Sequence, residues 1–120
     1  MMSSQLQARI KELLDTLMAE IRPLPSERSR LDFSYRLNSD AFILQKHARA
    51  MDTEIQVPHP VLKAVHAEEP EGWMLYQLDA EGHWQPHAGM VFTSELTDVM
   101  ATARLMAGVT QPPVSFDMAG

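Results

Sequence analysis

Residues 31–50, LDFSYRLNSDAFILQKHARA, decide the fold class. Positions 31, 33, 35 and 37 are apolar and the positions between them are polar, which is the period of a strand with one buried face. Asn38, Ser39 and Asp40 favour a turn, so the run from Ala41 to about Ala50 is expected to pair back as a second strand. The stretch therefore predicts an antiparallel hairpin.

The segment before this hairpin predicts an amphipathic helix that ends at Arg22 and Pro23. Its apolar residues recur at steps of three and four, at Leu6, Ile10, Leu13, Leu14, Leu17 and Ile21. Ser4 and Gln7 have the spacing of a capping box at its start. Pro23 disfavours helical geometry at Arg22, so Pro23–Ser29 is interpreted as a connecting loop.

The residues after the hairpin predict a short strand followed by a short helix. Thr53–Val57 alternates between polar and apolar side chains, and Pro58 and Pro60 interrupt it. Pro60 suits the first position of a helix, which would end by Pro70. The side chains expected to face the core from this helix are Val61, Leu62 and Val65.

The second half predicts another hairpin and a final helix. Trp73–Leu78 and His83–Phe92 flank a turn at 79–82, in which Gly82 can adopt the left-handed conformation. Thr93 or Ser94 is expected to cap a helix that stops at Gly108. The apolar stripe of this helix is Leu96, Val99, Met100, Ala103 and Met106.

These elements predict an α+β domain with an antiparallel sheet of about four to five strands and N-terminal, short central and C-terminal helices. A chain of 120 residues has the size of one domain, which we assign to residues 1–109. The tail, 110–120, contains Pro112 and Pro113 and is expected to be extended and flexible.

Composition excludes several classes of function. The chain has no cysteine, which excludes disulfides and thiolate metal sites, and its net charge of −6 argues against a nucleic-acid partner. No apolar run approaches the roughly 20 residues that span a bilayer, and no secretory signal is visible. We therefore expect a cytoplasmic protein that binds neither membrane nor nucleic acid.

The charge distribution points to a protein partner. Nine of the ten basic residues lie at or before Lys63, whereas eight of the sixteen acidic residues follow it. From Ala64 to Ala103 there is no lysine or arginine, so this half would attract a basic partner. The predicted partner-binding residues are Glu68, Glu69, Glu71, Trp73, Tyr76, Asp79, Glu81 and Trp84.

The aromatic residues among them allow two interpretations. In the strand 73–78, Trp73, Leu75 and Gln77 share one face, while Met74, Tyr76 and Leu78 share the other. Helices must cover one face. The opposite face is too apolar for plain solvent exposure, so either a second layer or a partner covers it.

No catalytic, cofactor or metal residue is predicted. His83 and His87 would stand roughly 13 Å apart on a strand, and His59 and His66 would lie two turns apart on a helix, so neither pair has chelating spacing. No serine lies in a Gly-x-Ser-x-Gly motif, and the five glycines form no phosphate-binding run.

The sequence WMLYQLDAEGHW, 73–84, followed by a second strand and a helix, resembles the small acidic immunity proteins of bacterial toxin systems. The resemblance covers the second half best and the N-terminal helix loosely, and it carries over no individual binding residue. It implies one-to-one binding of a cognate toxin domain, often basic, in the same cell. The mechanism it implies is occlusion.

The order of elements is also similar to that of the acidic effector chaperones of type III secretion, which act as dimers. In that alternative, Gly72–Gly108 would form the second sheet portion and the final helix, and the chain would be a homodimer. A small enzyme is a third alternative, ranked last because no motif supports it. The preferred hypothesis is a non-catalytic inhibitor that occludes a basic protein.

Overall fold

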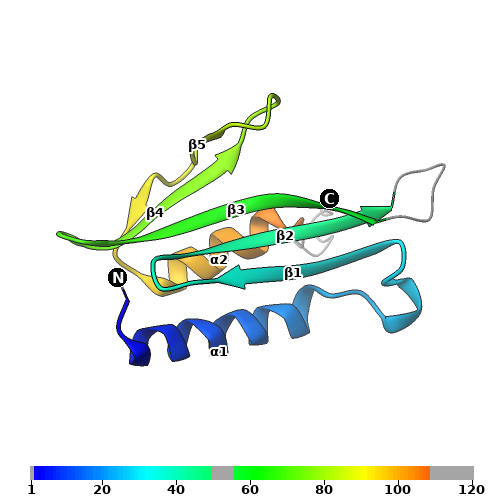
Figure 1. Ribbon diagram of the computed structural model, residues 1–120, viewed down its shortest axis with the longest axis horizontal. Coiled ribbons are helices and arrows are strands. Elements are labelled where there is room, and N and C mark those ends of the chain that lie inside the picture. The colour runs from blue at the N-terminus through cyan, green and yellow to red at the C-terminus, as the bar shows by residue number, and fades with distance from the viewer. Residues whose placement is uncertain (1, 50–55, 109–120) are drawn as a thin grey trace, which may run out of the picture.

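A six-stranded antiparallel sheet with both helices packed against one face forms the architecture of the protein (Figure 1). The computed structural model describes residues 2–49 and 56–108. The elements are α1 (Ser4–Ile21), a 3-10 turn (Pro25–Glu27), β1 (Leu31–Leu37), β2 (Ala41–Arg49), β3 (Gln56–Glu68), β4 (Glu71–Leu78), β5 (Trp84–Pro86), β6 (Phe92–Thr93) and α2 (Leu96–Met106). The sheet order is β1-β2-β3-β4-β5, with β6 also paired to β4. The predicted α+β class is confirmed.

Helix α1 forms where the apolar period predicts it. Its N-cap is Ser3, whose hydroxyl accepts a hydrogen bond from the Leu6 N–H at 3.1 Å, so the predicted cap at Ser4 is wrong by one residue. The side chain of Gln7 donates to the Met2 carbonyl instead of closing a capping box. Arg22 has extended backbone angles, as a residue before proline favours, and ends the helix. In the described ranges, no helix is long and apolar enough to cross a bilayer.

The hairpin of β1 and β2 has the predicted bounds and turn. Leu37 pairs with Phe42, and the side chain of Asn38 accepts hydrogen bonds from the N–H groups of Asp40 and Ala41. These bonds pair the backbone N–H groups of the turn with a side chain of the same turn. Such a turn can therefore be predicted from the sequence.

Strand β3 takes the place of the short helix predicted from Pro60 to Pro70. The strand predicted over Thr53–Val57 is a strand at Gln56 and Val57, and Thr53–Ile55 lies outside the described residues. Leu62 and Ala64 are fully buried while the residues between and after them are half-buried, so the period here is two. Leu62 and Ala64 pair with the core residues Leu44 and Phe42, and a register shift at Leu44/Gln45 leaves Val61 of β3 unpaired. The helix prediction was wrong because strand pairing on both edges, which is not local, outweighs the proline signal.

The prolines of β3 lie where the sheet tolerates them. Pro58 and Pro60 pair with β2, but β4 pairs with β3 only from Lys63 onward. This part of β3 forms ladder hydrogen bonds along one edge only. The missing N–H of a proline that faces the other edge therefore costs little stability. Pro70 lies in the two-residue turn between β3 and β4, where the Glu69–Pro70 peptide bond is cis.

The second hairpin is confirmed, but its returning strand is interrupted. Strands β5 and β6 pair along the same edge of β4, and 87–91 leaves the ladder between them. The Leu75 N–H donates to the Val91 carbonyl, and the His87 N–H donates to the Leu75 carbonyl. Leu75 of β4 therefore hydrogen-bonds both ends of the segment 87–91. His87 is buried, and its Nδ1 accepts hydrogen bonds from the N–H groups of Gly89 and Met90. This histidine is structural.

Helix α2 packs its predicted stripe into the core and ends before Gly108, whose φ is 87°. Its N-cap is Glu95, without a side-chain cap, so the predicted cap at Thr93 or Ser94 is wrong. The Thr93 hydroxyl instead accepts from the Glu95 N–H and donates to Asp98, which fixes the chain just before the helix. The predicted tail, 110–120, lies outside the described residues.

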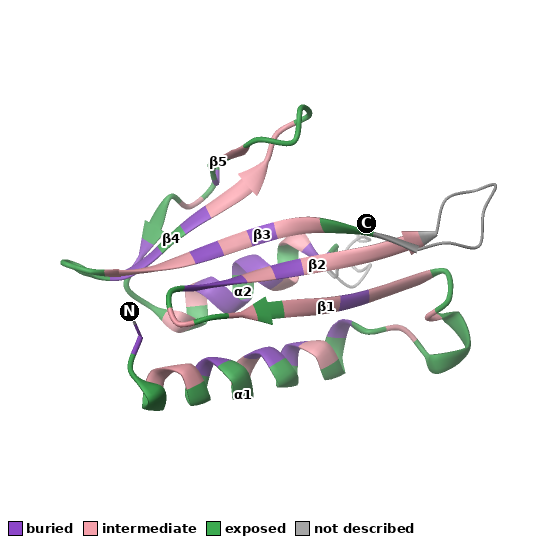
Figure 2. Ribbon diagram, viewed as in Figure 1, coloured by how far each residue is buried: buried purple, intermediate pink, exposed green. Residues whose placement is uncertain are grey.

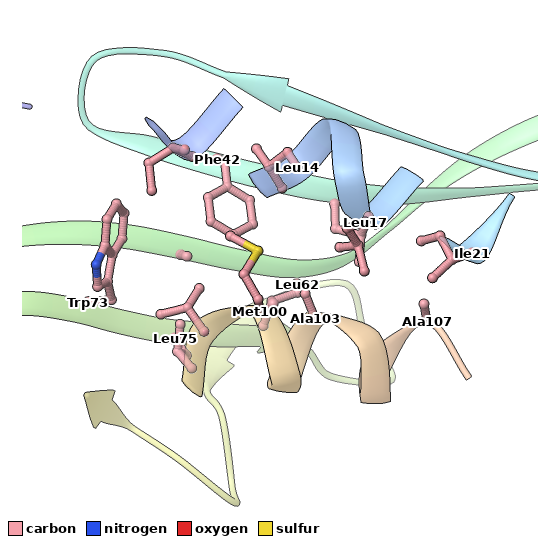
Figure 3. Packing of buried hydrophobic residues seen from close by; sticks show 14 of the residues in the cluster. Leu14, Leu17, Ile21, Phe42, Leu62, Trp73, Leu75, Met100, Ala103 and Ala107 are labelled. Carbon is pink, nitrogen blue, oxygen red and sulfur yellow. The ribbon is translucent and has the colours of Figure 1, made fainter. Parts of the chain in front are cut away.

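The core lies between the two helices and one face of the sheet (Figure 3). Its fully buried large side chains are Ile10, Leu14, Leu17, Phe42, Leu44, Leu62, Leu75 and Val99. Buried positions alternate along the central strands, whereas the turns at both ends of β4 are exposed (Figure 2). The second face of the sheet carries no helix of the described chain.

Candidate functional site

The predicted acidic residues fall into two exposed turns at opposite ends of β4. Glu68, Glu69 and Glu71 surround the β3–β4 turn, which we call the Glu69 turn. Asp79 and Glu81 lie in the β4–β5 turn, which we call the Asp79 turn. Because β4 has eight residues, the turns lie roughly 25 Å apart at the rise of a strand. The acidic surface is therefore two separate patches.

The Asp79 turn is built around its own carboxylate. Asp79 Oδ1 accepts hydrogen bonds from the N–H groups of Glu81 and His83 at 2.8 and 2.9 Å, and Gly82 has a φ of 85°. These bonds, with that from His83 the strongest, lower the pKa of Asp79. The carboxylate of Asp79 therefore has a structural role that a substitution would disturb.

The same turn brings together groups that could hold a cation. Ligand atoms of Asp79, Glu81 and His83 lie within 4.8 Å of one another, and all three residues are solvent-exposed. The hydrogen bonds of Asp79 account for this proximity without an ion. The histidines His59 and His66, predicted to lie two turns apart on a helix and not to chelate, lie instead on β3, roughly 23 Å apart.

The Glu69 turn has one buried neighbour, His66. The His66 side chain is 6% exposed, and its Nε2 lies 3.5 Å from the Glu71 carboxylate. Its ring meets the Trp73 ring edge-on at 5.0 Å between centroids. Its Nδ1 has no hydrogen-bond partner among the described residues. His66 therefore contacts both the Glu69 turn, through Glu71, and the core, through Trp73.

Trp73 itself is a core residue. It is 3% exposed and packs against Phe42, with the ring centroids 6.3 Å apart (Figure 3). A side chain inside the core cannot contact a partner, so Trp73 is removed from the predicted binding residues. The alternation that pairs it with Leu75 on one face was right, and that face is the covered one.

Tyr76 and Trp84 lie on the opposite face of the sheet, which we call the uncovered face. Both are half-buried. The Lys63 ammonium lies 5.6 Å from the centroid of the Trp84 ring, within range of a cation–π contact. Sequence reasoning missed Lys63 because it assigned this segment to a helix, whereas the register pairs Lys63 with Tyr76.

A serine–histidine pair also lies on the uncovered face. Ser34 Oγ is 2.6 Å from His47 Nε2, a distance at which a histidine could accept a proton from a nucleophile. His47 stands opposite Asp32 in the register, but the Asp32 carboxylate binds Arg22 instead. No described residue orients the other ring nitrogen of His47, so the pair lacks the third group of a catalytic triad.

Comparison with known protein families finds one match, to a domain of unknown function (DUF3024), over residues 2–105. No curated protein and no solved structure matches the chain. The resemblance to immunity proteins therefore stays a prediction.

Proposed function

Since the chain belongs to the DUF3024 family, whose description gives no activity, we propose from the geometry that it is a non-catalytic protein-binding protein that attracts a basic partner. The observation that carries the proposal is the field around β4. The sole lysine or arginine after Lys63 is Arg104, and it pairs with Glu20 of α1. The described part of the chain after Lys63 therefore supplies no other lysine or arginine to offset its carboxylates.

The carboxylates are also accessible. Glu69, Glu71 and Glu81 are exposed, and none of them pairs with a lysine or arginine of the described chain. Exposed charges of one sign raise the association rate with an oppositely charged protein and disfavour nucleic acid. A basic protein is therefore the partner class that this end of the molecule favours.

The aromatic residues beside the Asp79 turn supply contact area. Tyr76 and Trp84 are adjacent to it on the β4–β5 hairpin, and such side chains contribute strongly when a partner desolvates them. An immunity-type inhibitor that occludes a basic toxin domain combines these features. It is the specific form of the proposal that the sequence resemblance favours.

The test is capture followed by kinetics. The chain is used to capture proteins from a native cell lysate at low salt, and a stoichiometric basic protein is purified. Its association rate is then measured with the wild-type chain and with the double variant Glu69→Lys/Glu71→Lys across a salt series. We expect association to slow by about tenfold at low salt, with a weaker salt dependence.

The matched control is Glu12→Lys/Glu27→Lys, which makes the same charge change on the N-terminal half. Both residues are exposed, on α1 and on the 3-10 turn. We expect this control to change the association rate far less. Equal effects of the two double variants, or no protein retained at any salt, would contradict the proposal.

A further inference from the structure

The uncovered face is unusually apolar for a sheet surface that no helix of the described chain covers. Its apolar side chains are half-buried or exposed and come from β2, β3, β4, β5 and β6: Ile43, Val65, Met74, Tyr76, Trp84 and Phe92. Met74 is 38% exposed and Phe92 40% exposed. A contiguous apolar surface of this kind marks an interaction site.

Two cations lie on this face, Lys63 on the central strand β3 and Arg36 on the edge strand β1. The register places Arg36, Ile43, Lys63 and Tyr76 in one row across β1 to β4. Arg36 and Lys63 are two strands apart, which is about 10 Å. Among the described residues neither forms an ion pair, and Lys63 contacts the Trp84 ring. The face therefore requires an occupant with both apolar surface and carboxylates.

The chain itself presents that combination. Glu81 lies in the turn of the hairpin that carries Trp84, and this hairpin projects away from the rest of the sheet (Figure 1). Two copies related by a two-fold axis would place each Lys63 and Arg36 near the other copy's carboxylates, so the pairing occurs twice. Nucleic acid would also meet the two cations, but it would pass carboxylates at both ends of β4.

The size of the face suits such a pairing. Four strands, β1 to β4, at about 4.8 Å spacing and about seven residues of length give a face of roughly 19 by 23 Å, beside which β5 adds three residues. That is about 450 Å² in projection, and side-chain relief raises its accessible area toward the roughly 800 Å² that a stable interface buries on each partner. Edge-to-edge pairing is blocked along the open stretch of β3, because Pro58 and Pro60 lie there.

We propose that the protein forms a two-fold homodimer through its uncovered faces, with Arg36 and Lys63 of each copy paired to the Asp79 turn of the other. The inference goes beyond the proposed function, because it concerns the purified chain without any other protein. In this arrangement the Glu69 turn, at the far end of β4, remains open to a basic partner, whereas Tyr76, Trp84 and the Asp79 turn are covered, so a partner that contacts them would compete with the second copy.

The test is sedimentation of the purified full chain over a range of concentration and salt. We expect a dimer for the wild type and an increase of about tenfold or more in its dissociation constant for Lys63→Glu. Lys63→Arg should retain the dimer, and Lys63→Glu/Glu81→Lys should recover part of the lost affinity. Arg30→Glu is the matched control, since Arg30 is exposed in the loop before β1, outside the uncovered face.

Circular dichroism of every variant verifies folding, and the charge-swapped double variant keeps the test valid if one single variant is destabilised. A monomer at concentrations up to about 100 μM would overturn the inference, because an interface of this size gives tighter binding. Equal dimerisation of wild type and Lys63→Glu would overturn it too. A monomer that binds a fluorescent single-stranded oligonucleotide through Lys63 would assign the face to nucleic acid instead. The oligomeric state of the purified chain and the association kinetics of the Glu69→Lys/Glu71→Lys variant are separate measurements, so either proposal can fail while the other stands.

Discussion

The two faces of the sheet are both apolar, yet only one of them is covered by helices. On the covered face, Phe42, Leu44, Leu62 and Leu75 are each at most 1% exposed. On the uncovered face, the neighbouring Met74 is 38% exposed. Antiparallel sheets with one solvated face usually alternate apolar and polar residues. Strand alternation therefore identifies two faces, and the apolar stripes of the helices determine which one becomes the core.

The largest expected effect comes from two adjacent residues of β4. Leu75→Ala removes a fully buried side chain from the core and should lower the free energy of unfolding by about 2–5 kcal/mol. Met74→Ala, on the uncovered face, should cost under about 1 kcal/mol at micromolar protein concentration. Urea unfolding of both variants measures the contrast.

The same pair of variants also tests the homodimer proposal. If a second copy covers Met74, the cost of Met74→Ala should grow as protein concentration rises, because association stabilises the folded state by mass action. The cost of Leu75→Ala should show no such trend. Equal costs for the two variants at low concentration would contradict the assignment of the faces.

The next effect tests how the short strand β6 is held against β4. Gly72 is buried under the Phe92 ring, and a Cβ there would overlap Phe92 Cζ and lie 2.6 Å from the Thr93 carbonyl oxygen. Gly72→Ala should therefore destabilise the fold by about 1–3 kcal/mol, because β6 must shift.

A double-mutant cycle measures the contribution of the ring to this effect. Phe92→Ala relieves the overlap with the ring but leaves the Thr93 carbonyl in place. We therefore expect Gly72→Ala to cost less in the Phe92→Ala background than in the wild type. An unchanged cost would show that the backbone contact alone is responsible.

The elements that were predictable from sequence are those whose causes are local. Helix α1 follows from its own apolar period, and the hairpin of β1 and β2 follows from alternation plus an Asn38 side chain that hydrogen-bonds its own turn. Gly82 likewise closes the second hairpin with the conformation that glycine permits. In each case the residues that decide the structure lie within the element.

The elements that were not predictable depend on distant partners. The prolines of β3 suggested a helix, and only the pairing of this strand with β2 on one edge and β4 on the other makes it a strand. The predicted acidic site separates into two turns for the same reason. Its carboxylates are close in sequence but lie at opposite ends of β4. Trp73 could not be assigned to the core until the covered face was known.

The smallest effect concerns an ion pair that ties the helical layer to the edge of the uncovered face. Arg22, just after α1, donates two hydrogen bonds to the Asp32 carboxylate of β1, at 2.7 and 2.6 Å. These bonds hold the pKa of Asp32 below its usual value. Because the folded-state pKa is lowered, this stabilisation is present above the unfolded-state pKa of about 3.9 and is lost as pH falls through the folded-state pKa.

Asp32→Asn should therefore lower the free energy of unfolding by about 0.5–1 kcal/mol at pH 7, since Arg22 is 37% exposed and solvent screens the pair. As pH falls from about 4 toward 2, the difference from the wild type should shrink, because protonation of Asp32 progressively removes the charged pair from the wild type. Urea unfolding between pH 2 and pH 7 measures this convergence, with Glu27→Gln as the control for an exposed carboxylate. Asparagine can still accept the hydrogen bond from the Phe33 N–H, so a constant difference across that range would mean that Asp32 acts through packing or hydrogen-bond geometry and not through its charge.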